Sequence, residues 1–143
     1  MKRLIIAAIA LTIAVPALAA TNATIDKAAK EKGAVKTPSG MVYKSIKDGN
    51  GKAPSDSSVV EVNYRGTLTN GKEFDSSYKR KQSIKFPLSG VIPCWTEGVQ
   101  KMKVGGKAKL VCPPELAYGA RGAGSDVPPN ATLIFEVELL DVK

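Results

Sequence analysis

Alternation of apolar and polar residues predicts most of the strands in this chain. Val60, Val62 and Tyr64 are separated by polar side chains, which is the two-residue period of a half-buried strand. Asn70–Gly71 follows this strand and favours a hairpin, because both residues tolerate positive φ. The same period predicts further strands at 41–46, 84–88, 107–112 and 133–139.

A longer period predicts one short helix before the strand at 107–112. Trp95, Val99 and Met102 recur at i, i+4 and i+7, so they share one helix face, and Gly105 follows the helix end. The last two strands are separated by 113–130, a connection rich in proline and glycine and of a length that is usually functional. Together these elements predict an α+β domain, a mainly antiparallel sheet with one short helix on its apolar face.

The first forty residues do not share this pattern. A basic start, an uncharged apolar run and the small-x-small site Ala17–Leu18–Ala19 predict a secretory signal peptide over 1–19, cut after Ala19. A permanent membrane anchor is the less favoured alternative, because the run is short for a bilayer. Residues 20–40 are polar with at most a turn or two of helix, so we expect a flexible arm there. The domain is expected to cover 41–143.

Composition and charge exclude several kinds of chemistry. The chain has 143 residues, 43% hydrophobic and 24% charged, as in a single folded domain. It has no histidine and two cysteines, which excludes His-dependent nucleophilic catalysis and His₃ or Cys₄ zinc sites within one chain. We therefore expect neither a metal nor a cofactor. The net charge of +8 is spread along the chain without an Arg-rich, aromatic segment, which favours a solvated basic face over a nucleic-acid site.

Five motifs in the second part of the chain resemble one known family. In chain order they are Val62–Gly66, Gly71–Ser77, Val91–Val99, Leu116–Gly119 and Pro128–Phe135. In order and spacing, over 41–143, they resemble the FKBP-type peptidyl-prolyl cis-trans isomerases, and most closely the exported bacterial members. The resemblance implies a half-wrapped antiparallel sheet of five to six strands around one short helix, with the active site between the sheet and the helix.

The resemblance also implies the residues of a substrate pocket. Trp95 would form its floor under a proline ring, and the Tyr118 hydroxyl and the Ile92 N–H would hydrogen-bond substrate carbonyls. Asp75, Tyr118 and Tyr64 are the expected catalytic residues, with Asp75 facing the amide. The remaining expected substrate-binding residues are Phe74, Arg80, Phe86, Val91, Ile92, Trp95 and Phe135.

The implied reaction suits these residue types. Rotation about an X-Pro bond breaks no covalent bond, and its barrier of roughly 18–20 kcal/mol is lost amide resonance. A dry site that accepts the twisted amide better than the planar one lowers that barrier without a nucleophile. Taken singly, Val91, Ile92 and Phe86 would more often be plain core, and Asp75 could cap a turn.

The expected function is that of a rotamase that accelerates folding of proline-containing exported proteins, in the periplasm or after secretion. We expect a monomer without stable membrane insertion, since 20–40 is too short and polar to resemble the dimerising helices of some family members. Departures from the family pattern at Ile84 and 123–127 leave binding of macrolide inhibitors open. The alternative is a chaperone or binding module that uses the same pocket to hold unfolded clients.

Cys94 and Cys112 are predicted to form a disulfide. An exported chain with an even cysteine count enters an oxidising compartment, and the helix start with Cys94 should pack on the sheet face to which Cys112 points, in phase with Leu110. Such a bridge stabilises by around 3 kcal/mol in the chain-entropy model. Two buried free thiols are the alternative. Thiol–disulfide exchange is disfavoured because the chain has no Cys-x-x-Cys motif.

Overall fold

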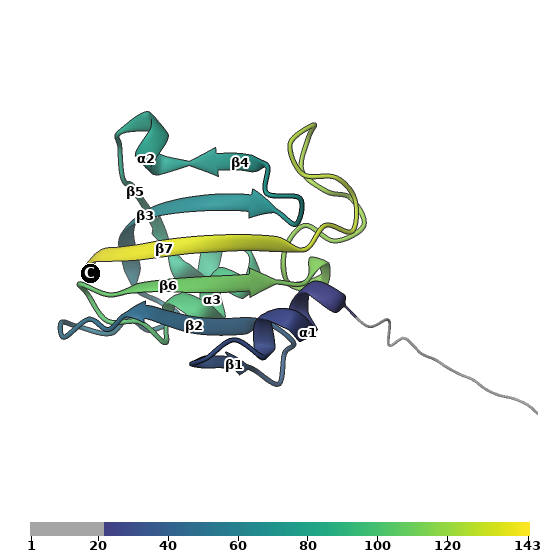
Figure 1. The fold of residues 1–143 in the computed structure, drawn as a ribbon. Coiled ribbons are helices and arrows are strands. Elements are labelled where there is room, and N and C mark those ends of the chain that lie inside the picture. Colours follow the sequence, from purple (N-terminus) through teal and green to yellow (C-terminus); the bar gives the residue numbers. More distant parts are fainter. Residues whose placement is uncertain (1–21) are drawn as a thin grey trace, which may run out of the picture.

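The computed structural model describes residues 22–143, so the predicted signal peptide lies outside the described residues. These residues form a seven-stranded antiparallel sheet in the order β1-β2-β6-β7-β3-β4, with β5 also paired to β3 (Figure 1). The strands are β1 (Ala34–Lys36), β2 (Val42–Lys47), β3 (Val59–Leu68), β4 (Glu73–Ser76), β5 (Ile84–Pro87), β6 (Lys107–Cys112) and β7 (Leu133–Val142). The predicted α+β fold is confirmed.

Helices are few and short. The helix that packs on the concave face of the sheet is α3, which begins with proline at its first position. The full set is α1 (Ala23–Ala29), α2 (Ser77–Arg80), η2 (Leu88–Gly90), α3 (Pro93–Val99) and η3 (Pro114–Leu116). None of the helices described in 22–143 is long and apolar enough to cross a membrane.

The main core lies between α3 and the sheet. Trp95 and Val99 of the helix contact a cluster that includes Leu110 of β6 and Val137 of β7, and all four are buried. The helix lies very close to β6, because a Cβ built on Gly98 would be 2.8 Å from a methyl group of Leu110. This close approach places the first turn of α3, with Trp95, against the middle of the sheet.

The segment predicted as a flexible arm instead covers the other face of the sheet. Helix α1 is capped by Asn22, whose side chain accepts from the Ile25 N–H at 3.1 Å. Ile25 and Ala28 pack in a second buried cluster with Val42 and Val111. The two strand residues point away from α3, so their apolar side chains need a separate cover. This differs from the expectation for 20–40, and β1 also pairs with β2.

Strand β4 and helix α2 connect the β3 hairpin to β5 and were not predicted. Helix α2 is one turn long and is capped by Ser76, whose Oγ accepts from the Lys79 N–H at 3.2 Å. The buried Ser77 hydroxyl accepts from the Tyr64 N–H at 2.8 Å, which fixes α2 to β3. These contacts bring β4 and α2 to the edge of the concave face, where the candidate site lies.

Candidate functional site

A cavity of about 610 Å³ opens between the concave face of the sheet and α3. Nine of the ten residues expected in the pocket line it, and Arg80 does not. Arg80 is instead exposed beside the cavity, where it contacts two of the lining residues. The lining residues are Tyr64, Phe74, Asp75, Ile84, Lys85, Phe86, Gly90, Val91, Ile92, Trp95, Tyr118 and Phe135.

Aromatic rings form the floor and one wall of this cavity. The Trp95 ring is 5% exposed, and its centroid lies 5.1 Å from Tyr64, 5.4 Å from Phe86 and 5.2 Å from Phe135. Phe74 packs edge-on against Phe135 at 5.6 Å. Edge-to-face contacts of this kind hold rings in fixed relative orientations. Within the described residues the buried Trp95 indole N–H has no hydrogen-bond partner, which indicates how few polar groups surround this floor.

A polar cluster lies at the edge of the cavity. The Tyr64 hydroxyl and the Arg80 guanidinium each donate a hydrogen bond to the Asp75 carboxylate. Arg80 also donates to the Tyr64 hydroxyl at 3.1 Å, and the Ser76 N–H donates to Asp75 at 2.9 Å. The cluster therefore fixes both oxygens of the carboxylate at the cavity edge.

The same contacts set the charge of the cluster. Partial burial alone would raise the pKa of Asp75, but hydrogen bonds from Tyr64 and Arg80 outweigh it, and the pKa is lowered. Burial, followed by the hydrogen bond to Asp75, raises the pKa of Tyr64. At neutral pH the cavity wall thus carries an anionic carboxylate, a neutral phenol and a cationic guanidinium.

Two further residues with polar groups line the cavity, Ile92 just before α3 and Tyr118 in the long loop. Ile92 directly precedes α3, and its N–H takes part in none of the backbone hydrogen bonds found within 22–143. Tyr118 lies in the 113–130 loop just after η3, and its side chain is 40% exposed. Gly119 beside it adopts φ of +59°, a conformation that favours glycine, and its N–H donates to the Pro114 carbonyl at 2.8 Å, which turns the loop back on itself.

Comparison with known proteins agrees with this arrangement. A family model described as FKBP-type peptidyl-prolyl cis-trans isomerase matches residues 50–140. This chain belongs to that family. FkpA of Escherichia coli K12, an FKBP-type peptidyl-prolyl cis-trans isomerase, is 58% identical over 118 residues, which are 82% of this chain and 43% of the relative. The chain thus spans less than half the length of that relative.

Solved structures of FKBP proteins have the same fold. The crystal structure of Escherichia coli FkpA has a TM-score of 0.82 at 56% identity, covering 85% of this chain and 56% of that one. The crystal structure of AtFKBP13 has a TM-score of 0.72 at 35% identity, covering 77% of this chain and 98% of that one. The family resemblance read from the sequence motifs is therefore confirmed.

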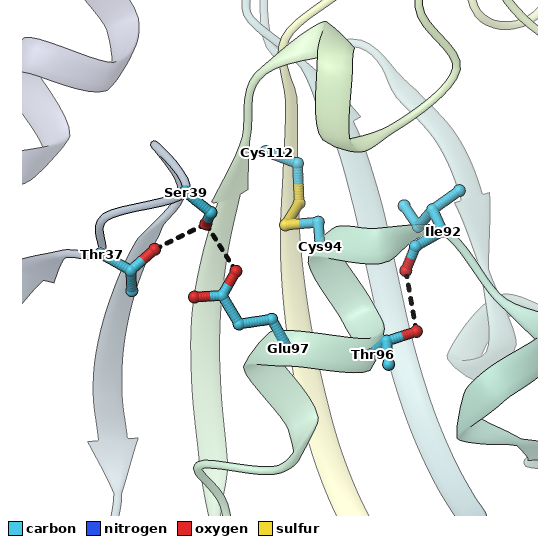
Figure 2. Close-up of a disulfide and its surroundings, with 7 residues drawn as sticks. All are labelled: Thr37, Ser39, Ile92, Cys94, Thr96, Glu97 and Cys112. Atoms are coloured by element: carbon cyan, nitrogen blue, oxygen red, sulfur yellow. Dashed lines mark hydrogen bonds between the residues drawn. A yellow bond between two sulfur atoms is a disulfide. The ribbon is translucent and has the colours of Figure 1, made fainter. Parts of the chain in front are cut away.

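This FKBP domain contains the predicted disulfide. Cys94 at the start of α3 is bonded to Cys112 at the end of β6, with Cα atoms 5.8 Å apart (Figure 2). Both side chains are fully buried, and 22–143 contains no free cysteine. The same residues contain no group of three His, Cys, Asp or Glu side chains that could bind a metal ion.

Three residues of the FKBP cavity were not assigned to it from the sequence. Ile84 was noted only as a departure from the family pattern, at a place where some members have an aromatic wall residue. It lines the cavity beside Phe86, because residues two apart in a strand share a face. Lys85 and Gly90 also line it, and no pattern in the sequence marks them. The lining residues therefore come from separate parts of the chain that only the fold brings together.

Proposed function

We propose that this chain is a peptidyl-prolyl cis-trans isomerase that acts on X-Pro bonds of exported proteins as they fold. One observation carries the proposal most: an apolar, aromatic-floored cavity has a fixed carboxylate at its edge, and no cysteine, serine, threonine or histidine is among its lining residues. Family membership supports the same activity.

The aromatic floor suits a proline ring. The five-membered ring would stack on the Trp95 indole, between Tyr64, Phe86 and Phe135, and would displace water from the cavity. As the amide twists, its resonance is lost and its carbonyl becomes less polar. A dry, apolar site therefore favours the twisted amide over the planar one, and this differential binding is what accelerates the rotation.

The polar groups would hold the substrate backbone. The Ile92 N–H and the Tyr118 hydroxyl, on the α3 and loop sides, are suited to donate to carbonyls on either side of the rotating bond. Asp75, held by Tyr64 and Arg80, would face the reacting amide and interact electrostatically with its partial charges, which change as resonance is lost. No proton transfer is needed in this scheme.

We also propose that the isomerase acts in the periplasm or after secretion. The sequence of 1–19 has the order of a signal peptide, and a buried disulfide is typical of an oxidising compartment. Its substrates would be unfolded or partly folded exported proteins that contain proline. The cavity is large enough to admit a macrolide inhibitor.

A protease-coupled assay on a proline tetrapeptide tests the proposal. We expect catalysed isomerisation that an active-site macrolide blocks, and Tyr118→Phe should lower the rate about tenfold without unfolding the domain. Absence of catalysis by the folded protein would refute the proposal. Suppression of client aggregation that persists with a blocked cavity would instead support the chaperone alternative.

A further inference from the structure

Helix α3 depends on contacts with other elements for its position. It has seven residues, from Pro93 to Val99, and contains a glycine at position 98. A helix this short is not stable by itself in water, and glycine weakens it further. Its first turn carries Trp95, the floor of the cavity. The contacts that fix this turn therefore also fix the floor.

The strongest of these contacts is the disulfide. Cys94 immediately precedes Trp95, and its bond to Cys112 attaches the first turn of α3 to the end of β6 (Figure 2). Cys112 lies inside the sheet, since it pairs with Leu133 of β7. Both cysteines are fully buried, so the bond is shielded from solvent. The first turn of α3 is thus attached covalently to the end of an inner strand of the sheet, one residue from the cavity floor.

The non-covalent contacts of the same turn are weaker. The Thr96 hydroxyl donates to the Leu88 carbonyl at 2.6 Å, and Glu97 accepts from the Ser39 hydroxyl at 2.5 Å. Figure 2 shows Thr96 and Glu97 pointing to opposite sides of the helix. The Ser39 bond is exposed, so water competes for it. These bonds orient the helix, whereas the disulfide, together with the core packing of Trp95 and Val99, limits its distance from the sheet.

We propose that the Cys94–Cys112 disulfide is a positioning element of the FKBP cavity and does more than stabilise the fold. It holds the Trp95 ring and the Ile92 N–H, which lie on either side of Cys94, at a fixed spacing from the Asp75 cluster on β4. This inference rests on the proposed isomerase function. It assigns a catalytic consequence to a bond that no substrate touches.

Loss of the disulfide is expected to affect kcat more than substrate binding. Apolar contact between a proline ring and an indole is not directional, so a loosened floor still binds the planar ground state. Stabilisation of the twisted amide requires that the Ile92 N–H, the Trp95 ring and the Asp75 carboxylate are all correctly placed at the same time. A displacement of about 1 Å can cost as much as 100-fold in rate. A mobile first turn should therefore lower kcat more than it raises KM.

The double variant Cys94→Ala/Cys112→Val tests this inference, with Val111→Ala as the matched control. Val111 is buried in the cluster on the opposite face of the sheet, so its truncation destabilises the domain without contacting α3. We expect the disulfide variant to lose about tenfold in kcat with KM within about twofold. Trp95 is the only tryptophan, so its emission reports the floor directly and should change in this variant alone.

Reduction of the wild-type protein with a phosphine in urea, which exposes the buried bond, followed by removal of the urea, gives the same comparison without substitutions. This measurement also serves if the double variant does not fold. The loss of kcat should appear on reduction and disappear on reoxidation. A folded disulfide-free protein with wild-type kcat and wild-type Trp95 emission would overturn the inference. If the oxidised wild type lacks isomerase activity, the proposed function fails, while the emission comparison still decides whether the disulfide fixes the floor.

Discussion

Replacing Asp75 by leucine tests whether the carboxylate at the cavity wall contributes to isomerisation. The change removes the acceptor of hydrogen bonds from Tyr64, Arg80 and the Ser76 N–H. If the fixed negative charge favours the twisted amide by about 1.4 kcal/mol, kcat/KM on a proline tetrapeptide falls about tenfold. The aromatic floor is untouched, so KM should change less than kcat.

The effect on stability should be smaller than for a buried carboxylate. A hydrogen bond to a charged group contributes about 1.5–3 kcal/mol when buried. The side chains of Asp75 and Arg80 are 39% and 47% exposed, so solvent screening reduces the loss to about 1 kcal/mol. In a domain of this size that lowers Tm by about 5 °C, and the variant remains folded at 25 °C.

The stability difference should also depend on pH in a defined direction. Because the native pKa of Asp75 is lowered, its contribution is complete above the ordinary carboxyl pKa. The contribution disappears as the pH falls through the lowered native value. The difference in free energy of unfolding between the wild type and Asp75→Leu should therefore shrink as the pH falls below the ordinary carboxyl value of about 3.9, which urea titrations at several pH values measure.

Glu73→Leu is the matched control for Asp75→Leu. Glu73 lies two residues earlier on β4 and pairs with Arg65 at 2.7 Å, with side chains 27% and 45% exposed. It does not line the cavity. We expect a similar small loss of stability with full activity. The reasoning is refuted if folded Asp75→Leu keeps the wild-type rate, or if Glu73→Leu loses as much activity.

Three further predictions concern the floor, the helix and the pH profile. Trp95→Leu should keep partial activity, about tenfold below wild type in kcat/KM, because another apolar side chain still supports the proline ring. Gly98→Ala should lower the free energy of unfolding, measured in urea, by about 1 kcal/mol. The added methyl group overpacks against Leu110 at a cost of about 1–3 kcal/mol, which exceeds the gain in helix propensity, and a stabilised variant would contradict this. Because the pKa of Asp75 is lowered and that of Tyr64 raised, kcat/KM should vary less than about twofold from about pH 6 to 8.5, and a bell-shaped profile would indicate proton transfer.

The sequence predicted those elements that bury one face in the main core. The alternation in β3 and β7 is strong because Val62, Tyr64, Val137 and Leu139 all point towards α3. Tertiary packing and local pattern agree in these strands, so their positions follow from the two-residue period. The cavity residues were assigned by resemblance, because the period alone does not distinguish a pocket wall from plain core.

Elements with few buried residues were predicted only in part: a turn or two of helix was allowed for in 20–40 but its packing on the sheet was not, and β4 was not predicted. Helix α1 buries Ile25 and Ala28, and two apolar residues do not make a helical stripe. The signal lies instead in the strands, where Val42 and Val111 are apolar on the face expected to be polar. Strand β4 has four residues and a register shift against β3, so it shows no period that a sequence pattern could reveal.

Gly66 is a residue of β3 whose identity is determined by the space that the cavity rings need. Within β3 it pairs with Asp75 on one side and with Phe135 on the other. A Cβ at this position would lie 2.6 Å from the Phe74 ring and 2.9 Å from the Phe135 ring. Glycine weakens a strand interior, yet here it makes room for two rings that form one cavity wall. The residue is therefore determined by the cavity across several elements and not by the local preference of β3.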